Sequence, residues 1–261
     1  MKALLAILLL SSTFLHAHMT DDLQVGHRNE PLGVDDTHPR LSWRIAGDET
    51  GLKQSAYQVL VATRPELLEA GKADLWNSGR IQTGESAIIY NGKDLPSSKW
   101  VHWTVRTWHG DQPSNWAEAT RFLTARIGSQ PTAPYISFKD TTPFHTDRKK
   151  LHLPPARYYR KTFEAKAGKK ITSAILHATA LGIYDLHLNG QAIEQGASYF
   201  APGWTNYRKR AYYNTYDLTP MMGPWVGTRH CMGAVVADGW YAGYVGYGKL
   251  VGYGPNKTGR N

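Results

Sequence analysis

The stretch Gly182-Ile-Tyr-Asp-Leu-His-Leu-Asn-Gly190 decides how the second half of this 261-residue chain folds. Leu186 and Leu188 alternate with polar residues, and this period of two predicts a β-strand with one apolar face. The dipeptide Asn189-Gly190 follows directly, and it favours the type I′ turn of a two-residue hairpin because both residues tolerate positive φ. The stretch therefore predicts a strand that turns back on itself at Gly190.

Other β patterns lie on both sides of this hairpin. We expect further strands at Tyr158 to Phe163, Ile171 to Ala180, Arg210 to Tyr216 and Cys231 to Ala237. Together they would supply about half to two-thirds of a jelly-roll sandwich, which needs roughly eight strands. We assign residues 157–261 to this domain and expect it to be incomplete, because Gly243 to Asn261 reads as a Gly-rich loop without a closing strand. A natural disordered tail is the alternative explanation of that end.

The first half of the chain has the pattern of a separate all-β domain, which we place at residues 20–125. Its short apolar runs, separated by turn residues, are typical of a fibronectin type III or immunoglobulin-like sandwich. The expected strands are Arg40 to Ile45, Ala56 to Val61, Ser86 to Tyr90, Trp100 to Trp108 and Ala119 to Leu123. One short helix is expected at Pro65 to Lys72, since Pro lies near its start and Gly near its end.

Two segments are expected to lie outside these domains. Residues 126–156 gather prolines and polar residues, which is typical of a linker. Residues 1–17 have the pattern of a signal peptide, with Lys2 before an apolar run and small residues near the end. We therefore expect a secreted or periplasmic protein.

Composition excludes several classes of protein. The formal charge of +9 comes from basic residues scattered along the chain, which indicates a solvated surface rather than a nucleic-acid site. No segment after the leader is a better candidate for a membrane span. The single cysteine, Cys231, has no partner for an intrachain disulfide, and we expect a small core residue there. Phosphate-loop, nucleophile-elbow and zinc-protease motifs are not found.

Three stretches together resemble the amino-terminal region of bacterial α-L-rhamnosidases. They are Gly182 to Gly190, Ala201-Pro-Gly-Trp-Thr-Asn-Tyr-Arg-Lys-Arg210 and Ala237-Asp-Gly-Trp-Tyr-Ala-Gly243. The resemblance extends forward over Arg28 to Asp36, Pro39 to Arg44, Gln54 to Ala62 and Leu75 to Gly79. It implies a fibronectin-like domain, a jelly-roll domain and then a helical α/α barrel, which carries the catalytic acid and base of an inverting hydrolase. We expect that barrel to be missing from this chain.

Candidate sugar-contacting residues lie in two of the three stretches. Rings stack on sugar faces, while amides and carboxylates pair with sugar hydroxyls. The candidates for carbohydrate binding are Trp204, Asn206, Tyr207, Asp238, Trp240 and Tyr241, although a core or turn role is an equal alternative for each.

No catalytic residue and no metal ligand is assigned. The acidic residues of the second domain, among them Asp185, Asp217 and Glu194, form no recognisable catalytic pair. The resemblance implies that calcium is possible, since some relatives bind rhamnose with it, but the ligands cannot be assigned to positions here.

The sequence leaves three functions open. The first is the accessory front part of an α-L-rhamnosidase, inactive alone, whose partners are rhamnose-containing glycosides or polysaccharides and the missing barrel domain. The second is a free-standing rhamnose-binding β-sandwich protein without catalysis. The third is a structural surface protein built of sandwich domains.

Overall fold

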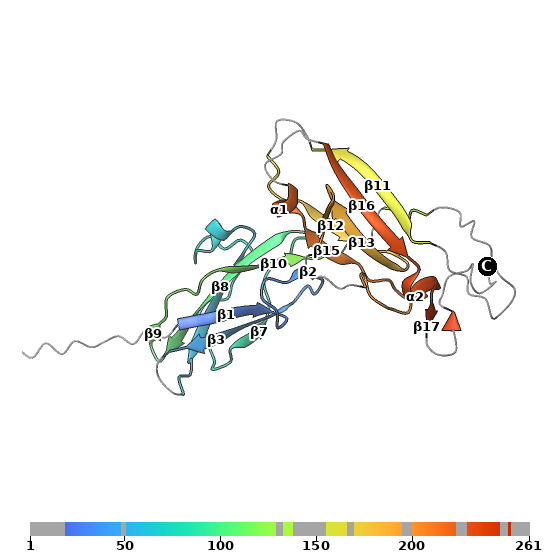
Figure 1. Cartoon of the computed structure of the whole chain (residues 1–261). Helices are drawn as coiled ribbons and strands as arrows, with labels where there is room; N and C mark the ends of the chain where they lie inside the picture. Colours follow the sequence, from blue (N-terminus) through green and yellow to red (C-terminus); the bar gives the residue numbers. More distant parts are fainter. Residues whose placement is uncertain are drawn as a thin grey trace, which may run out of the picture. The chain divides into compact units, whose positions relative to one another are not determined.

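The computed structural model describes residues 19–47, 51–128, 133–137, 155–165, 170–194, 200–222, 229–245 and 250–251. Nearly all regular structure in these ranges is β, so the predicted all-β class is confirmed (Figure 1). The chain divides into two compact units, of which the first ends at Thr124 and the second begins at Ala125. The expected signal peptide and most of the expected linker lie outside the described residues.

The first unit is built from two β-sheets. Its strands are β1 (Met19–Val25), β2 (Leu32–Val34), β3 (Arg40–Ala46), β4 (Ala56–Ala62), β5 (Trp76–Asn77), β6 (Ile81–Gln82), β7 (Ala87–Ile89), β8 (Trp100–His109), β9 (Gln112–Pro113) and β10 (Thr120–Thr124). One sheet has the order β1-β3-β7 and the other β2-β10-β8-β4-β5, while β6 pairs with β4 and β9 with β8. All five strands expected in this half are present.

The core of the first unit forms around the central strands of the larger sheet. β4 is buried along its whole length, and in β8 the side chains of Val101, Trp103 and Val105 have no exposed surface. Leu41 of the smaller sheet and Phe122 of β10 are equally buried. This alternation of buried residues explains why Trp100 to Trp108 reads as a strand in the sequence.

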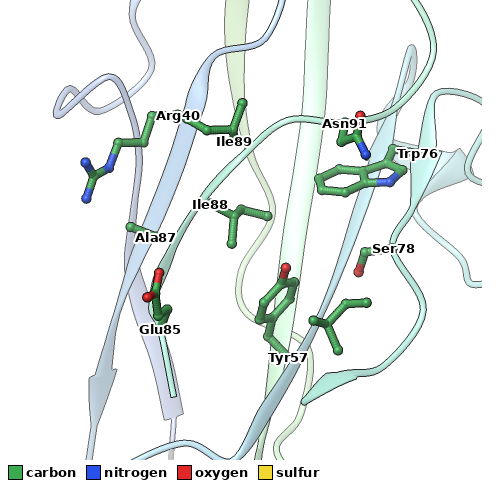
Figure 2. A pocket seen from close by; sticks show the side chains of 10 residues that line it. Arg40, Tyr57, Trp76, Ser78, Glu85, Ala87, Ile88, Ile89 and Asn91 are labelled. Carbon is green, nitrogen blue, oxygen red and sulfur yellow. The ribbon is translucent and has the colours of Figure 1, made fainter. Parts of the chain in front are cut away.

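A cleft opens between residues of the two sheets in this unit. It has a volume of about 580 Å³ and is lined from the β3 and β7 side as well as from the β4, β5 and β6 side (Figure 2). Tyr57, Trp76 and Ile88 lie around its centre, and Arg40 and Glu85 lie on its β3 and β7 side (Figure 2).

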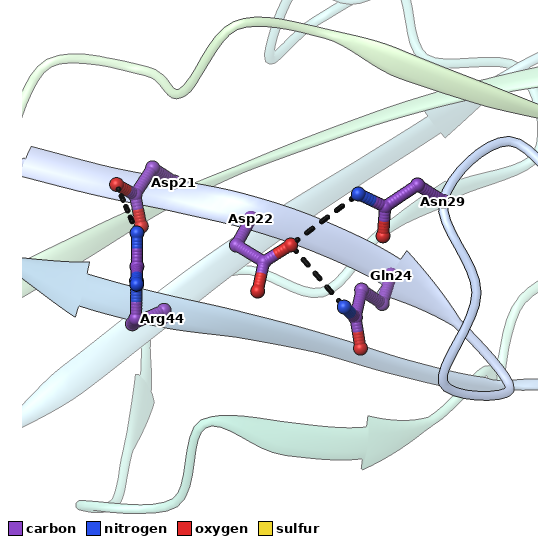
Figure 3. Close-up of polar contacts among 5 residues, drawn as sticks. All are labelled: Asp21, Asp22, Gln24, Asn29 and Arg44. Carbon is purple, nitrogen blue, oxygen red and sulfur yellow. Dashed lines mark hydrogen bonds and ion pairs between the residues drawn. The ribbon is translucent and has the colours of Figure 1, made fainter.

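Strand β1 contains a bulge that polar side chains hold in place. The register with β3 shifts between Asp21 and Gln24, and Asp22 has a positive φ of 48°. The Asp22 carboxylate accepts hydrogen bonds from Gln24 and Asn29, while Arg44 donates two hydrogen bonds to Asp21 (Figure 3). The hydrogen bonds from Arg44 hold the pKa of Asp21 below its usual value. The two carboxylates thus tie side chains of β1, of β3 and of the loop after β1 together at the bulge.

The prediction of a helix over Pro65 to Lys72 is wrong about its length. The structure has only a 3₁₀ helix, η1 (Pro65–Leu67), whose turn ends where Leu68 leaves helical conformation with ψ of 54°. Its following residues fold into turns in which Lys72 and Ala73 donate to the carbonyl of Glu69. Proline starts the turn as predicted, but no apolar face is buried there to extend it.

The second unit is also built from sheets, with two single-turn helices. Its elements are β11 (Arg157–Glu164), β12 (Ile175–Ala178), β13 (Ile183–Leu188), β14 (Gln191–Ala192), β15 (Asn214–Asp217), α1 (Thr219–Met222), β16 (Arg229–Ala237), α2 (Gly239–Ala242), β17 (Tyr244–Val245) and β18 (Leu250–Val251). The main sheet has the order β11-β16-β13-β14, and β12 pairs with β15 in a second sheet.

The predicted hairpin at Asn189-Gly190 is confirmed. Both residues have positive φ, 54° and 84°, and Leu188 pairs with Gln191 across the turn. The Asn189 side chain also accepts a hydrogen bond from the backbone of Cys231 at 2.8 Å, which ties the turn to β16. Leu186 and Leu188 are buried, as their alternation predicts.

One buried cluster joins the main sheet of the second unit to the sheet of β12 and β15. It consists of Ala180, Tyr184, Leu186, Leu188, Ile193, Ala201, Tyr216, Leu218 and Met222. Within it the hydroxyls of Tyr184 on β13 and Tyr216 on β15 lie 3.0 Å apart. Burial, and next the hydrogen bond with Tyr216, raise the pKa of Tyr184, so the Tyr184 hydroxyl stays neutral in this cluster.

Two expectations for the second unit need correction. The strand expected from Arg210 begins only at Asn214, because the carbonyl of Asn206 accepts the amides of Lys209 and Arg210 and closes a turn. The Gly-rich end reads in the sequence as a loop without a closing strand, whereas β17 and β18 pair there with each other. Their two-stranded sheet is separate from the main sheet. Residues 252–261 lie outside the described part.

Candidate functional site

The rings of two sequence-predicted stretches meet in the second unit. The indoles of Trp204 and Trp240 are stacked, with centroids 6.3 Å apart and planes 10° apart. Phe200 meets the edge of Trp240 at 5.4 Å, and Tyr207 meets Tyr241 edge-on at 5.4 Å. We call these five residues the aromatic cluster. Four of its members were predicted as sugar contacts, and the structure brings them together in two neighbouring pairs.

Exposure divides the aromatic cluster into an outer and an inner part. Trp204 and Phe200 are 57% and 55% exposed, whereas Trp240, Tyr207 and Tyr241 are partly buried. Exposed rings of this size carry apolar surface that folding leaves uncovered. Phe200 is a member that sequence reasoning missed, because it stands just before the Ala201 to Arg210 stretch.

The loop that carries Trp204 is anchored to the sheets. Ala201 and Pro202 are buried and joined by a cis peptide bond, and the carbonyl of Ala201 accepts the amide of Tyr184 on β13 at 2.8 Å. The Thr205 hydroxyl donates to the carbonyl of Arg210, which closes the loop beyond the ring. Trp204 therefore extends from a backbone that is fixed at both ends.

Asn206 has a turn-forming role in this loop. Its side-chain oxygen accepts the amide of Arg208 at 3.2 Å, and its carbonyl accepts the amides of Lys209 and Arg210. Asn206 is exposed, two positions after Trp204 in the same loop. The turn role that the sequence left open is present, and sugar contact at Asn206 stays a prediction.

Asp238 is held by an ion pair. Its carboxylate lies 3.2 Å from the guanidinium of Arg157, and both side chains are less than one-fifth exposed. Its carbonyl accepts the amides of Tyr241 and Ala242, which forms the single turn of α2. Asp238 thus holds Trp240 and Tyr241 in place, and a direct contact between its carboxylate and sugar stays a prediction.

Two glycines let this motif pack against β13. A Cβ on Gly182 would lie 2.2 Å from the carbonyl oxygen of Ala237, and one on Gly239 would lie 2.7 Å from the Ile183 side chain. Both glycines have positive φ, 133° and 47°. The backbones therefore approach more closely than any side chain at these two positions would allow.

The other acidic residues of the second unit are dispersed. Asp217 is buried and its carboxylate accepts the amide of Thr219 at the start of α1. Asp185 and Glu194 are exposed. In the described ranges no group of three or more His, Cys, Asp or Glu side chains is placed to hold a metal ion, so no residue is assigned to calcium. No helix among the described residues is long and apolar enough to cross a membrane.

Cys231 lies on β16 and is partly exposed rather than in the core. Its sulfur accepts a hydrogen bond from Arg160 of the neighbouring β11 at 3.2 Å. The expectation of a core residue is therefore wrong, because its side chain faces away from the buried cluster toward a basic edge strand.

Comparisons with protein-family models match both units. Residues 20–128 match the Rha78A-like N-terminal immunoglobulin domain, and residues 169–260 match the α-L-rhamnosidase N-terminal domain. The fold and the two matches together define two successive amino-terminal β domains. The chain belongs to the α-L-rhamnosidases, as their amino-terminal region.

Individual relatives agree with this assignment. An α-L-rhamnosidase of Formosa agariphila is 33% identical over 89% of this chain and 24% of its own length, and one of Alteromonas sp. is 31% identical over 93% and 26%. The solved α-L-rhamnosidase of Dictyoglumus thermophilum superposes with a TM-score of 0.73 at 30% identity, over 85% of this chain and 25% of that one. The chain thus spans about a quarter of the length of the relatives it matches.

Proposed function

We propose that this chain is the amino-terminal accessory region of a secreted α-L-rhamnosidase, which removes terminal non-reducing α-L-rhamnose from rhamnosides. The observation that carries the proposal is the succession of two rhamnosidase amino-terminal domains along one chain. The substrates would be rhamnose-containing glycosides or polysaccharides.

The described residues supply no hydrolytic step of their own in this proposal. Glycoside hydrolysis by inversion needs an acid and a base on opposite faces of the sugar. The buried carboxylates of the second unit are engaged, Asp217 at the start of α1 and Asp238 with Arg157. We therefore assign hydrolysis to a helical barrel domain that these residues do not include.

The contribution of the second unit would be contact with the substrate through the aromatic cluster. Trp204 presents an exposed ring backed by the parallel ring of Trp240. Such a ring stacks on the apolar face of a sugar, and the exposed Asn206 beside it adds a polar group for hydroxyls. Trp240, Tyr207, Tyr241 and Asp238 would support this surface from behind.

The test compares two proteins in one assay. The chain alone and the polypeptide encoded by its complete reading frame are incubated with a chromogenic α-L-rhamnoside. We expect release of the chromophore by the second protein and none by the first. Release by the chain alone would overturn the accessory role, and no release by either would overturn the assignment to an active rhamnosidase.

The second candidate is a free-standing rhamnose-binding protein. The exposure of Trp204 and Phe200 favours this candidate, because exposed rings are available to a sugar. The parallel ring of Trp240 holds Trp204 in the orientation that stacking on a sugar needs. This candidate predicts two results together: the complete reading frame encodes no barrel, and the chain alone binds rhamnose in a titration.

The location follows from the amino-terminal pattern and is also a proposal. We propose export to the periplasm or the medium. Fractionation of the native host, with a variant in which Leu8 is replaced by Arg, tests it: the unmodified chain should leave the cytoplasm and the variant should stay there. Retention of both would overturn export.

A further inference from the structure

The cleft of the first unit has the size and lining of a ligand site. Its volume of about 580 Å³ lies within the range of small-molecule pockets. Rings and aliphatic side chains line it together with polar groups of several kinds, namely Arg40, Tyr57, Trp76, Ser78, Ile81, Glu85, Ala87, Ile88, Ile89 and Asn91. All of them belong to one unit, so the cleft is complete within it.

Tyr57 is a largely buried residue whose hydroxyl points into this space. The residue is only 7% exposed, yet its hydroxyl makes no hydrogen bond within the part of the chain that the structure describes. Figure 2 shows the hydroxyl directed into the cleft between Ile88 and Trp76. The ring is fixed from behind by an edge contact with Trp43 at 5.3 Å. The hydroxyl is therefore available to a ligand in the cleft, and a hydrogen bond to it would add to the affinity.

Glu85 lines the same cleft just before β7. Burial, and next the negative charge of Glu85, raise the pKa of Tyr57. The hydroxyl thus remains a neutral donor, and the Glu85 carboxylate is an acceptor across the cleft. Backbone anchoring of this segment is firm, since the buried Gln54 donates to the carbonyl of Glu85 at 2.5 Å.

Trp76 is held rigidly on the β5 side. Tyr90 contacts its ring edge-on at 5.4 Å, and the Tyr90 hydroxyl donates to the carbonyl of Lys93. Gly92 packs so closely that a Cβ there would lie 2.6 Å from the Cβ of Trp76. A ring that is fixed before binding loses little entropy when a ligand stacks on it.

We propose that this cleft binds a neutral sugar residue with one apolar edge. The indole of Trp76 would stack on the ring, and Tyr57, Glu85, Ser78 and Asn91 would pair with hydroxyls as donors and acceptors. Ile81, Ile88 and Ile89 form the aliphatic part of the wall, which suits a methyl group in place of a hydroxymethyl group.

Other ligand classes fit the cleft less well. A phosphate or carboxylate ligand would meet the charge of Glu85, while the guanidinium of Arg40 lies away from Tyr57 and Trp76 (Figure 2). A cation would find only one carboxylate in the lining. A neutral polyhydroxylated ligand carries no charge that the lining would have to compensate. The proposal does not depend on rhamnosidase activity, because the binding belongs to the first unit alone.

Calorimetric titration of the full chain tests the proposal. The probes are methyl α-L-rhamnopyranoside and methyl α-L-mannopyranoside, which differ only in a methyl against a hydroxymethyl group. We expect saturable binding in the millimolar range and tighter binding of the rhamnoside. Equal affinities would overturn the role of the isoleucines, and no saturation with either probe at tens of millimolar would overturn the site.

Variants locate the binding on the chain. Tyr57→Phe keeps the ring and removes only the hydroxyl, and it should weaken binding about five- to tenfold. Trp76→Ala should abolish the binding that remains when Trp204→Ala has removed the second surface, while Trp100→Ala, a partly buried Trp outside the cleft, should bind like the unmodified chain. Because Trp204 offers a second surface, Trp204→Ala is titrated in parallel. Full binding by Tyr57→Phe together with loss in Trp204→Ala would place the sugar in the second unit and overturn the proposal.

Discussion

The indole rings of Trp204 and Trp240 lie almost parallel, although 36 positions of sequence separate a loop residue from a residue of α2. Only Trp204 is strongly exposed. The inner ring therefore fixes the plane of the outer one, and the outer ring remains open to a ligand.

Replacing Trp204 by Ala should weaken binding of rhamnosides by the second unit about two- to tenfold, the value of one stacked ring. Stability should change little, because most of the side chain is exposed. Titration followed by tryptophan fluorescence measures the first effect, and thermal unfolding the second. Tyr158→Ala is the control, since Tyr158 is 81% exposed on β11 and stands outside the aromatic cluster. Equal binding by both variants would contradict a sugar role for Trp204.

Replacing the buried Gln54 by Leu should destabilise the first unit by about 2–4 kcal/mol. Gln54 accepts the indole N–H of Trp43 at 2.9 Å and donates to the carbonyls of Glu85 and Thr83, so the variant leaves buried polar groups unpaired. Urea unfolding measures the loss. The exposed Gln112→Leu is the control and should stay within about 0.5 kcal/mol of the unmodified chain. A similar midpoint for the two variants would show that the Gln54 network contributes nothing.

Replacing Gly182 by Ala should destabilise the second unit by more than about 2 kcal/mol, because the new Cβ would meet the carbonyl oxygen of Ala237 at a φ of 133°. Gly233→Ala is the matched control, since its Cβ would meet His187 at 3.7 Å, an ordinary contact. Guanidinium unfolding followed by near-ultraviolet circular dichroism compares them. Equal stability of both variants would mean that the backbone at Gly182 relaxes without cost.

His102 should make the first unit less stable in mild acid. Burial, and next the charge of Arg121, lower its pKa below 6.5, while Glu66 and Glu30 partly oppose this. The unfolded chain therefore binds more protons as the pH falls. The stability that neutral His102 contributes is complete above about pH 6.5 and is lost as the pH falls through the lower folded-state pKa.

The variant His102→Gln should flatten this dependence, as measured by urea midpoints from neutral pH down to pH values near 5. His27→Gln, a change at an exposed histidine, should leave the slope of the unmodified chain unchanged. A slope that persists in His102→Gln would assign the acid sensitivity to other groups.

Local patterns predicted five strands of the first unit and the main strands of the second, but they did not predict β1, β17, β18 or the short strands β2, β5, β6 and β9. The alternation around Leu186 and the turn at Asn189-Gly190 specify a hairpin without reference to any distant residue. The helix at Pro65 failed because its stop depends on what packs beside it, and no residue of η1 is buried. The strands that begin at Ile175 and Asn214 are shorter than the segments expected from the apolar runs. The backbone just before each strand makes hydrogen bonds in loops instead.

The sites were predictable to different degrees. Motif spacing singled out Trp204 and Trp240, but only the fold shows that their rings stack and that Asp238 is paired with Arg157. The cleft around Tyr57 gave no separate signal, because a Tyr in a buried strand reads as core. Its free hydroxyl depends on the spacing of two sheets, which no sequence period records.

The order of strands in the second unit has a consequence for how it is made. β11 pairs along its whole length with β16, so Arg157 can pair only after Val236 has been synthesised. During synthesis the hairpin of β13 and β14 can close first, while the earlier β11 has no neighbour until β16 emerges behind it. An emerging chain therefore exposes an unpaired strand, with Tyr158 and Phe163 on it, for most of the time that this unit takes to appear. Chaperone demand should be greatest in that interval.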